Sequence, residues 1–107
     1  MEITETKHPA ATVLALAGRL DGLASPALEQ RVDAALASGA KTLVLDLSAL
    51  AYVSSAGLRV FLGAAKKFKT AGGRATFVAL PAPVREVFEL SGFLGVLDVR
   101  ADLASAL

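Results

Sequence analysis

Residues 46–62 have the sequence DLSALAYVSSAGLRVFL and join a strand to a helix. The strand is predicted over residues 42–47 (TLVLDL), because a nearly continuous apolar run of this length is typical of a buried strand. The helix is predicted from about Ala56 to Thr70, with one apolar face made of Leu58, Phe61, Leu62, Ala65 and Phe68. A short link over residues 48–53 therefore leads to Ser54 and Ser55, at or beside the helix N-terminus.

The residues at the beginning of the chain predict a hairpin. Residues 2–7 (EITETK) are expected to form an exposed edge strand, and residues 11–17 (ATVLALA) a buried strand. His8-Pro9 predicts the turn between them, because a residue before proline is pushed out of the helical region. Residues 18–23 (GRLDGL) are predicted to be a loop.

A first helix is predicted to begin at Ser25-Pro26, with Ser25 as N-cap and Pro26 at the first helical position. Its apolar stripe consists of Leu28, Val32, Ala35 and Leu36, and Gly39 is its expected end. One helix between two buried strands requires a parallel pair with a right-handed crossover.

The residues after the central helix add further strands and helices. Ala71-Gly72-Gly73 is expected to end that helix, and residues 75–80 (ATFVAL) predict a third buried strand. Pro83 is expected to open a helix that ends at Gly92, with Val84, Val87 and Phe88 facing inward. Residues 96–99 predict a short strand, and residues 102–107 a final helical turn.

These elements predict an α/β fold with a mixed, mostly parallel sheet of about four to five strands and helices packed against it. The apolar strands imply cover on both faces for at least part of the sheet. A chain of 107 residues fits one domain, so residues 1–107 are expected to form a single unit.

Composition argues against several classes of function. The 11 Lys and Arg residues nearly balance the 10 Asp and Glu residues, whereas nucleic-acid binders carry a clear basic excess. The one basic cluster (Lys66, Lys67, Lys69 and Arg74) is expected to be a solvated helix end. No stretch approaches about 18 apolar residues, and the first residues lack the pattern of a signal peptide. We therefore expect a cytoplasmic protein with no nucleic-acid or membrane partner.

The residues offer little to an enzyme or a metal site. Disulfides and thiolate ligands are excluded because the chain has no cysteine, and its only histidine, His8, lies in a predicted turn. The sequence SSAG around Ser55 differs from the Gly-x-Ser-x-Gly turn of hydrolases, and phosphate-binding glycine motifs are missing. We expect no enzymatic activity, no metal and no cofactor.

The serine pair before the central helix has two interpretations. Serine is a favoured N-cap, so spacing alone makes a structural cap the better interpretation. One serine is enough for a cap, however, and here there are two. Gly57 in the first turn costs about 1 kcal/mol of helix propensity relative to alanine. It therefore indicates either a close backbone approach or a partner that packs nearby.

Three blocks of the sequence, in the right order, resemble the STAS domains of bacterial anti-sigma factor antagonists. The first is AGRLDGLASPALEQRV (17–32), which is similar to the family's Gly-x-Leu-Asp loop and first helix. The second is DLSALAYVSSAGLRVFL (46–62), which is similar to its Ser-x-Gly-Leu signature. The third is PAPVREVFELSGFLGVL (81–97), which looks like its third helix.

The resemblance implies a binding switch. In this family a serine just before x-Gly-Leu is phosphorylated by a partner kinase that is also the anti-sigma factor, and a metal-dependent serine phosphatase reverses the reaction. That serine is Ser55 here, and Ser54, where many members have Asp, is the second choice. The unmodified form would bind the anti-sigma factor and release a sigma factor. The implied partner surface comprises Asp21, Ser54, Ser55, Ala56, Gly57, Leu58 and Arg59. We expect the free protein to be a monomer.

Three other functions stay open at this point. The chain could be a STAS module of a different assembly, such as a signalling scaffold or a lipid-transport complex, with Ser54 and Ser55 only as a helix cap. It could be a flavodoxin-like phosphotransfer protein, although such proteins cluster acidic residues at a strand end and this strand offers only Asp46. It could also be a plain structural subunit.

Overall fold

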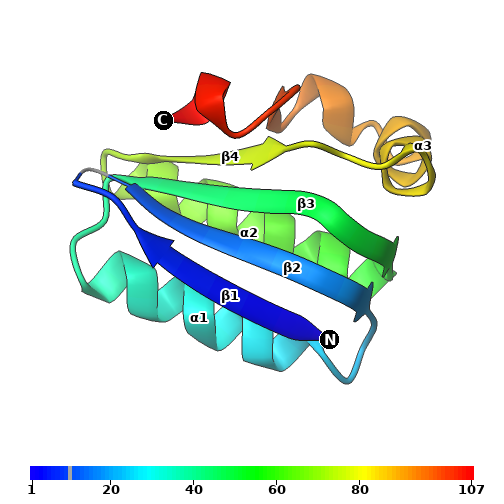
Figure 1. Cartoon of the computed structure of the whole chain (residues 1–107), viewed down its shortest axis with the longest axis horizontal. Coiled ribbons are helices and arrows are strands. Elements are labelled where there is room, and N and C mark those ends of the chain that lie inside the picture. The colour runs from blue at the N-terminus through cyan, green and yellow to red at the C-terminus, as the bar shows by residue number, and fades with distance from the viewer. Residues whose placement is uncertain (10) are drawn as a thin grey trace.

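Five strands form one sheet in the order β1-β2-β3-β4-β5, with β1 antiparallel to β2 and the later pairs parallel. The computed structural model describes residues 1–9 and 11–107. The predicted α/β fold with a mixed, mostly parallel sheet is confirmed. Figure 1 shows the elements in chain order: β1 (Glu2–Lys7), β2 (Ala11–Leu20), α1 (Ser25–Ala37), β3 (Thr42–Val53), α2 (Ser55–Thr70), β4 (Arg74–Val78), α3 (Ala82–Leu90) and β5 (Asp98–Arg100), with 3-10 turns at Phe93–Gly95 and Ala104–Ala106.

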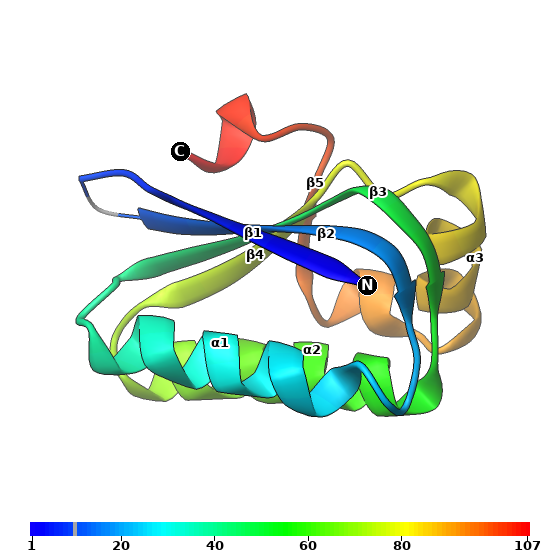
Figure 2. The same cartoon turned by 60° about the horizontal axis from the view of Figure 1, so that its bottom comes forward.

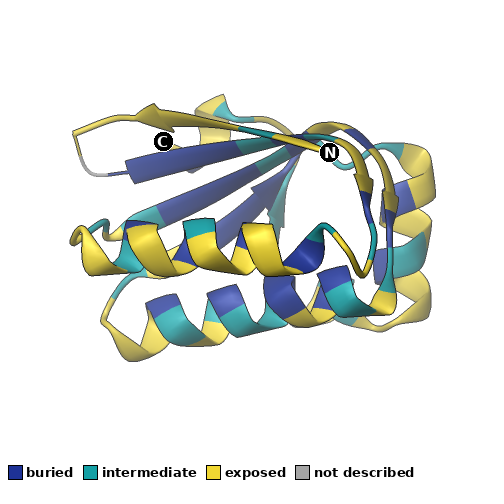
Figure 3. Ribbon diagram, turned by 90° about the horizontal axis from the view of Figure 1, so that it is seen from below, coloured by how far each residue is buried: buried dark blue, intermediate teal, exposed yellow. Residues whose placement is uncertain are grey.

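Helices α1 and α2 lie side by side on one face of the sheet (Figure 2). Alternate residues of the parallel strands point toward these two helices. The side of each helix that faces the sheet is buried, and the side that faces away is exposed (Figure 3). The ring centroid of Phe61 lies 5.1 Å from that of Phe77 and 6.0 Å from that of Phe88, which joins α2, β4 and α3 in one core. The predicted apolar face of α2 is confirmed at Leu58, Phe61 and Phe68, which are buried. Leu62 and Ala65 are only half-buried at its edge, and the prediction missed the buried Val60 and Ala64.

A lysine on α2 links the two helices at the surface. The Lys67 ammonium lies 2.8 Å from a carboxylate oxygen of Asp33 and 3.6 Å from one of Glu29, both on α1. The hydrogen bond from Lys67 to Asp33 raises the pKa of the lysine, despite slight burial. The basic cluster predicted as a solvated helix end is therefore only partly solvated: Lys66, Lys69 and Arg74 are exposed, but Lys67 is paired.

The opposite face of the sheet is covered mainly by the C-terminal turn, above the sheet in Figure 2. Val13, Val44 and Val78 form a small buried cluster there with Ala106 of the turn. The prediction that part of the sheet is covered on both faces is confirmed. On this second face the covering element is a 3-10 turn of three residues, Ala104–Ala106.

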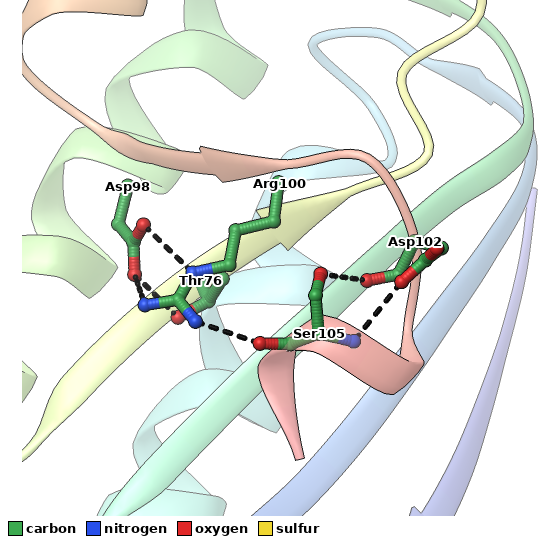
Figure 4. A network of polar contacts seen from close by, with 5 residues as sticks. All are labelled: Thr76, Asp98, Arg100, Asp102 and Ser105. Atoms are coloured by element: carbon green, nitrogen blue, oxygen red, sulfur yellow. Dashed lines mark hydrogen bonds and ion pairs between the residues drawn. The ribbon is translucent and has the colours of Figure 1, made fainter.

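Arg100 of β5 connects this turn to the sheet through hydrogen bonds (Figure 4). Its guanidinium donates to the Ser105 carbonyl at 2.6 Å and to the two carboxylate oxygens of Asp98 at 3.2 and 3.3 Å. The Thr76 hydroxyl donates to the same carboxylate at 2.9 Å. Burial alone would raise the pKa of Asp98, but the hydrogen bonds from Arg100 and Thr76 and the charges of Arg100 and Arg74 outweigh it and hold that pKa below its ordinary value.

The ends of β2 and β3 differ from the prediction. Residues 18–20 and 48–53 were expected as loop and link, but both strands continue as a two-stranded ribbon that curls toward the helices (Figure 2). Register shifts at Ala15/Ala17 and Gly18/Arg19 provide the curl, and Gly18 has a φ of +100°. The ribbon buries Leu20, Leu50 and Val53 over the end of the core.

Smaller boundary errors have local causes. β4 ends at Val78, two residues early, because Ala79 has a φ of +58° that a strand cannot hold. β5 begins at Asp98, two residues late, because the N–H groups of Val96 and Leu97 bond back to the carbonyl of Phe93. α3 begins at Ala82, one residue before Pro83.

Candidate functional site

Ser54 is the N-cap of helix α2. Its backbone is extended (φ −87°, ψ 171°), and its hydroxyl oxygen accepts a hydrogen bond from the Gly57 N–H at 3.1 Å. Its own N–H donates to the Leu20 carbonyl at 2.8 Å, which ties the start of α2 to the end of β2. The structural cap predicted for the serine pair is thus made by Ser54.

Ser55 is the first residue of α2 and is exposed. Among residues 1–9 and 11–107, its hydroxyl has no hydrogen-bond partner. The backbone N–H groups of Ser55 and Ala56 are also without a protein partner in the part of the chain described, as is usual in the first turn of a helix. A small neutral hydroxyl therefore faces solvent where free donors and the helix dipole favour negative charge.

Gly57 brings the first turn of α2 against the strand ends. A Cβ at this position would lie 2.7 Å from Cγ of Leu20 and 3.0 Å from Cγ2 of Val53. Of the two explanations for this glycine, a close backbone approach is therefore found within the chain itself. Gly57 and Leu58 are buried and are not accessible to a partner. The neighbouring residues of the expected partner surface on α2, Ser55 and Arg59, are exposed.

Asp21 shapes the loop next to α2. Its carboxylate accepts hydrogen bonds from the N–H groups of Leu23 at 3.1 Å and Ala24 at 2.9 Å. Its carbonyl accepts from the Ser25 hydroxyl at 2.7 Å. The prediction of Ser25 as N-cap is therefore wrong: Ala24 is the N-cap, and Ser25 is the buried first residue of α1. The Asp21 carboxylate thus orders the loop before α1, while no side chain caps the helix itself.

Segments far apart in the sequence meet beside Ser55. A shallow groove of about 280 Å³ is lined by Gly22 of the loop, by Ser25 and Glu29 of α1, and by Ala56 and Arg59 of α2. Arg59 is exposed and has no carboxylate partner within residues 1–9 and 11–107. Asp21, Ser54, Ser55, Ala56 and Arg59 thus lie on one end of the molecule, at the surface or close beneath it.

Groups suited to catalysis are not gathered at this site. His8 lies in the turn after β1, at the opposite end of the parallel strands from Ser55. The carboxylate of Asp46 accepts from the Ser48 N–H at 3.0 Å. In the described part of the chain, no three His, Cys, Asp or Glu side chains could hold a metal ion together. No helix formed by those residues is long and apolar enough to cross a membrane.

A model of the STAS domain family matches residues 2–106. The chain belongs to the STAS domain family. This agrees with the resemblance carried by residues 17–32, 46–62 and 81–97.

Relatives of this STAS domain carry the name of anti-sigma factor antagonists. BtrV of Bordetella bronchiseptica, so named, is 38% identical over 99 residues, which cover 92% of this chain and 85% of BtrV. The crystal structure of an anti-sigma factor antagonist from Mycobacterium paratuberculosis is 28% identical, with a TM-score of 0.88 over 98% of this chain and 89% of that one. Such antagonists are regulatory binding proteins, so the family is not one of enzymes.

The fold is also that of SpoIIAA, an anti-sigma factor antagonist. Its unphosphorylated form is 19% identical, with a TM-score of 0.77 over 97% of this chain and 92% of that one. SpoIIAA of Bacillus has been solved in the phosphorylated form as well.

Three residues near Ser55 were given no role by the sequence. The Arg19 guanidinium lies 4.2 Å from the ring centroid of Tyr52, across the outer face of the ribbon. Leu23, in the loop after Asp21, is 93% exposed. Arg19 and Tyr52 are paired across β2 and β3, and this pairing follows from the strand register. Residues 18–23 and 48–53 were expected to be a loop and a link, so no pairing was predicted for them.

Proposed function

We propose that this STAS domain is an anti-sigma factor antagonist controlled by phosphorylation of Ser55. The unmodified form binds an anti-sigma factor, which is also a serine kinase, and so releases a sigma factor. Phosphorylated Ser55 no longer binds, and a metal-dependent phosphatase restores the active form. The observation that carries the proposal is the division of roles in the serine pair: Ser54 caps α2, while the Ser55 hydroxyl is exposed and unbonded.

The start of α2 suits a phosphate without rearrangement of the domain. A phosphate adds about −1.5 to −2 charges at pH 7. The helix dipole and the N–H groups of Ser55 and Ala56 favour that charge. Arg59, exposed and one turn further along the same helix, is in position to pair with it.

The switch therefore acts on the partner. A protein surface that packs over the small hydroxyl of Ser55 meets a bulky dianion after phosphorylation. Repulsion and desolvation at such an interface cost several kcal/mol. Because about 1.4 kcal/mol changes an affinity tenfold, this loss is enough to separate the complex.

The other parts of the proposal follow from the same site. The domain acts as a binding module and not as an enzyme, because within the described residues no histidine or carboxylate hydrogen-bonds to the Ser55 hydroxyl to activate it. We place its action in the cytoplasm, where sigma factors and their kinases meet. Residues 1–107 would be sufficient for binding as a single domain.

The test is binding to the cognate anti-sigma factor with and without ATP. Ser55→Ala is expected to stay bound in the presence of ATP, whereas wild type is released and Ser55→Asp binds at least tenfold more weakly. Ser54→Ala is the matched control: it removes the cap but should still be released by ATP. Equal release of wild type and Ser55→Ala on addition of ATP would show the proposal to be wrong.

A further inference from the structure

We propose that the anti-sigma factor also binds a second groove, on the other side of the loop over residues 21–24 from Ser55. This inference rests on the proposed function and extends the partner surface to β1 and α1. The groove, called here the N-terminal groove, has a volume of about 490 Å³ and is lined by Met1, Ile3, Arg19, Asp21, Leu23 and Ala27. It takes an apolar side chain of the partner together with a neighbouring carboxylate.

The apolar part of the groove consists of exposed side chains, one of them on an ordered loop. Leu23 is 93% exposed and Met1 is 43% exposed, so both offer surface to a partner. The loop that carries Leu23 is fixed, because the Asp21 carboxylate binds the N–H groups of Leu23 and Ala24. Because these hydrogen bonds order the backbone of the loop, a partner that covers Leu23 has little loop motion to freeze on binding, which favours the loop as an anchor.

The charge of the groove points to a carboxylate on the partner. The Asp21 carboxylate is already occupied by two backbone N–H groups. Arg19 has no carboxylate partner in the described part of the chain, and its guanidinium lies 4.2 Å from the Tyr52 ring centroid. A stacked guanidinium keeps its N–H groups free at the edge, where they match a carboxylate in geometry. Arginine and tyrosine are also among the residues enriched at the positions that dominate binding energies at interfaces.

The position of the groove links it to the partner that covers Ser55. The Leu20 carbonyl accepts from the Ser54 N–H at 2.8 Å, and Asp21 follows Leu20 directly. The loop therefore has the N-terminal groove on one side and the groove beside Ser55 on the other. A stable interface buries about 800 Å² on each partner, far more than the first turn of α2 offers. A partner centred on Ser55 therefore covers neighbouring segments as well, and this loop borders the groove beside Ser55.

The experiment measures the affinity of the unphosphorylated protein for its purified cognate anti-sigma factor, in the absence of ATP. Leu23→Ser and Arg19→Glu are each expected to weaken binding tenfold or more. Leu90→Ser is the matched control, because Leu90 is 82% exposed on α3 outside both grooves, and it should change the affinity less than twofold. Thermal unfolding of each variant shows that the domain remains folded.

The outcomes separate this inference from the proposed function. If wild type binds and is released by ATP, but Leu23→Ser and Arg19→Glu bind as wild type does, the groove is not a partner site. The same holds if Leu90→Ser weakens binding as much as Leu23→Ser. If wild type fails to bind any anti-sigma factor kinase, the proposed function is wrong and this inference falls with it.

Discussion

At the scale of single residues, backbone position separates two identical side chains. Ser54 and Ser55 are neighbours of the same type, but Ser54 is extended and accepts from Gly57, whereas Ser55 is helical and faces solvent. An N-cap side chain reaches the free N–H groups only from an extended backbone. Gly57 makes this arrangement possible, because it lets the first turn of α2 lie on Leu20 and Val53.

Gly57→Ala tests that close approach. The new Cβ would overlap with Leu20 and Val53, and overpacking of this kind costs about 1–3 kcal/mol. The gain in helix propensity of about 1 kcal/mol offsets only part of it. We expect a lower free energy of unfolding in urea. Gly63→Ala in the same helix, where nothing lies within 4 Å of the added Cβ, should instead stabilise by about 0.5–1 kcal/mol. Equal effects of the two substitutions would contradict the packing assigned to Gly57.

At the scale of elements, two segments complete the core: the curled ribbon of β2 and β3 covers one end of it, and the C-terminal turn covers the face of the sheet opposite α1 and α2. The curled ribbon of β2 and β3 buries Leu20, Leu50 and Val53 and delivers Ser54 to the start of α2. The C-terminal turn covers Val13, Val44 and Val78, and Arg100 with Asp98 holds it there. The ribbon therefore positions Ser54 and Ser55, while the turn covers apolar residues of the sheet at a distance from them.

The Asp98–Arg100 contact predicts a pH dependence of stability. The folded-state pKa of Asp98 is lowered, so its contribution is present above the ordinary pKa of Asp and is lost as pH falls through the folded-state value. Because the pair is partly exposed, we expect less than about 1 kcal/mol. Urea unfolding should show Asp98→Asn to be less stable than wild type at pH 6, and the difference should shrink at pH 3. A difference that grew toward pH 3 would contradict this assignment.

At the scale of the whole molecule, strand order follows chain order and the crossover helices α1 and α2 lie on one face. The sheet therefore lacks the point of reversed strand order at which α/β proteins form a ligand crevice. Ser55 stands on an end with shallow grooves, a surface suited to a protein partner more than to a small substrate.

The sequence could predict the elements that depend on local periodicity. The apolar runs of residues 11–17 and 42–47 and the stripe of α2 identify the core directly. Three features depended on contacts between distant residues and could not be predicted. Strand bulges carried β2 and β3 beyond their apolar runs. The Ser25 hydroxyl donates to the Asp21 carbonyl, so that Ser25 lies inside α1 and does not cap it. The bond from Ser54 to Leu20 decided which serine caps α2.

The central claim is that Ser55, and not Ser54, carries the switch. The most direct measurement is mapping of the phosphate by tandem mass spectrometry after incubation with the cognate anti-sigma factor kinase and ATP. The account predicts one phosphate on Ser55 in wild type and in Ser54→Ala, and none in Ser55→Ala. A phosphate found on Ser54, or a Ser55→Ala protein still modified in this helix turn, would contradict it.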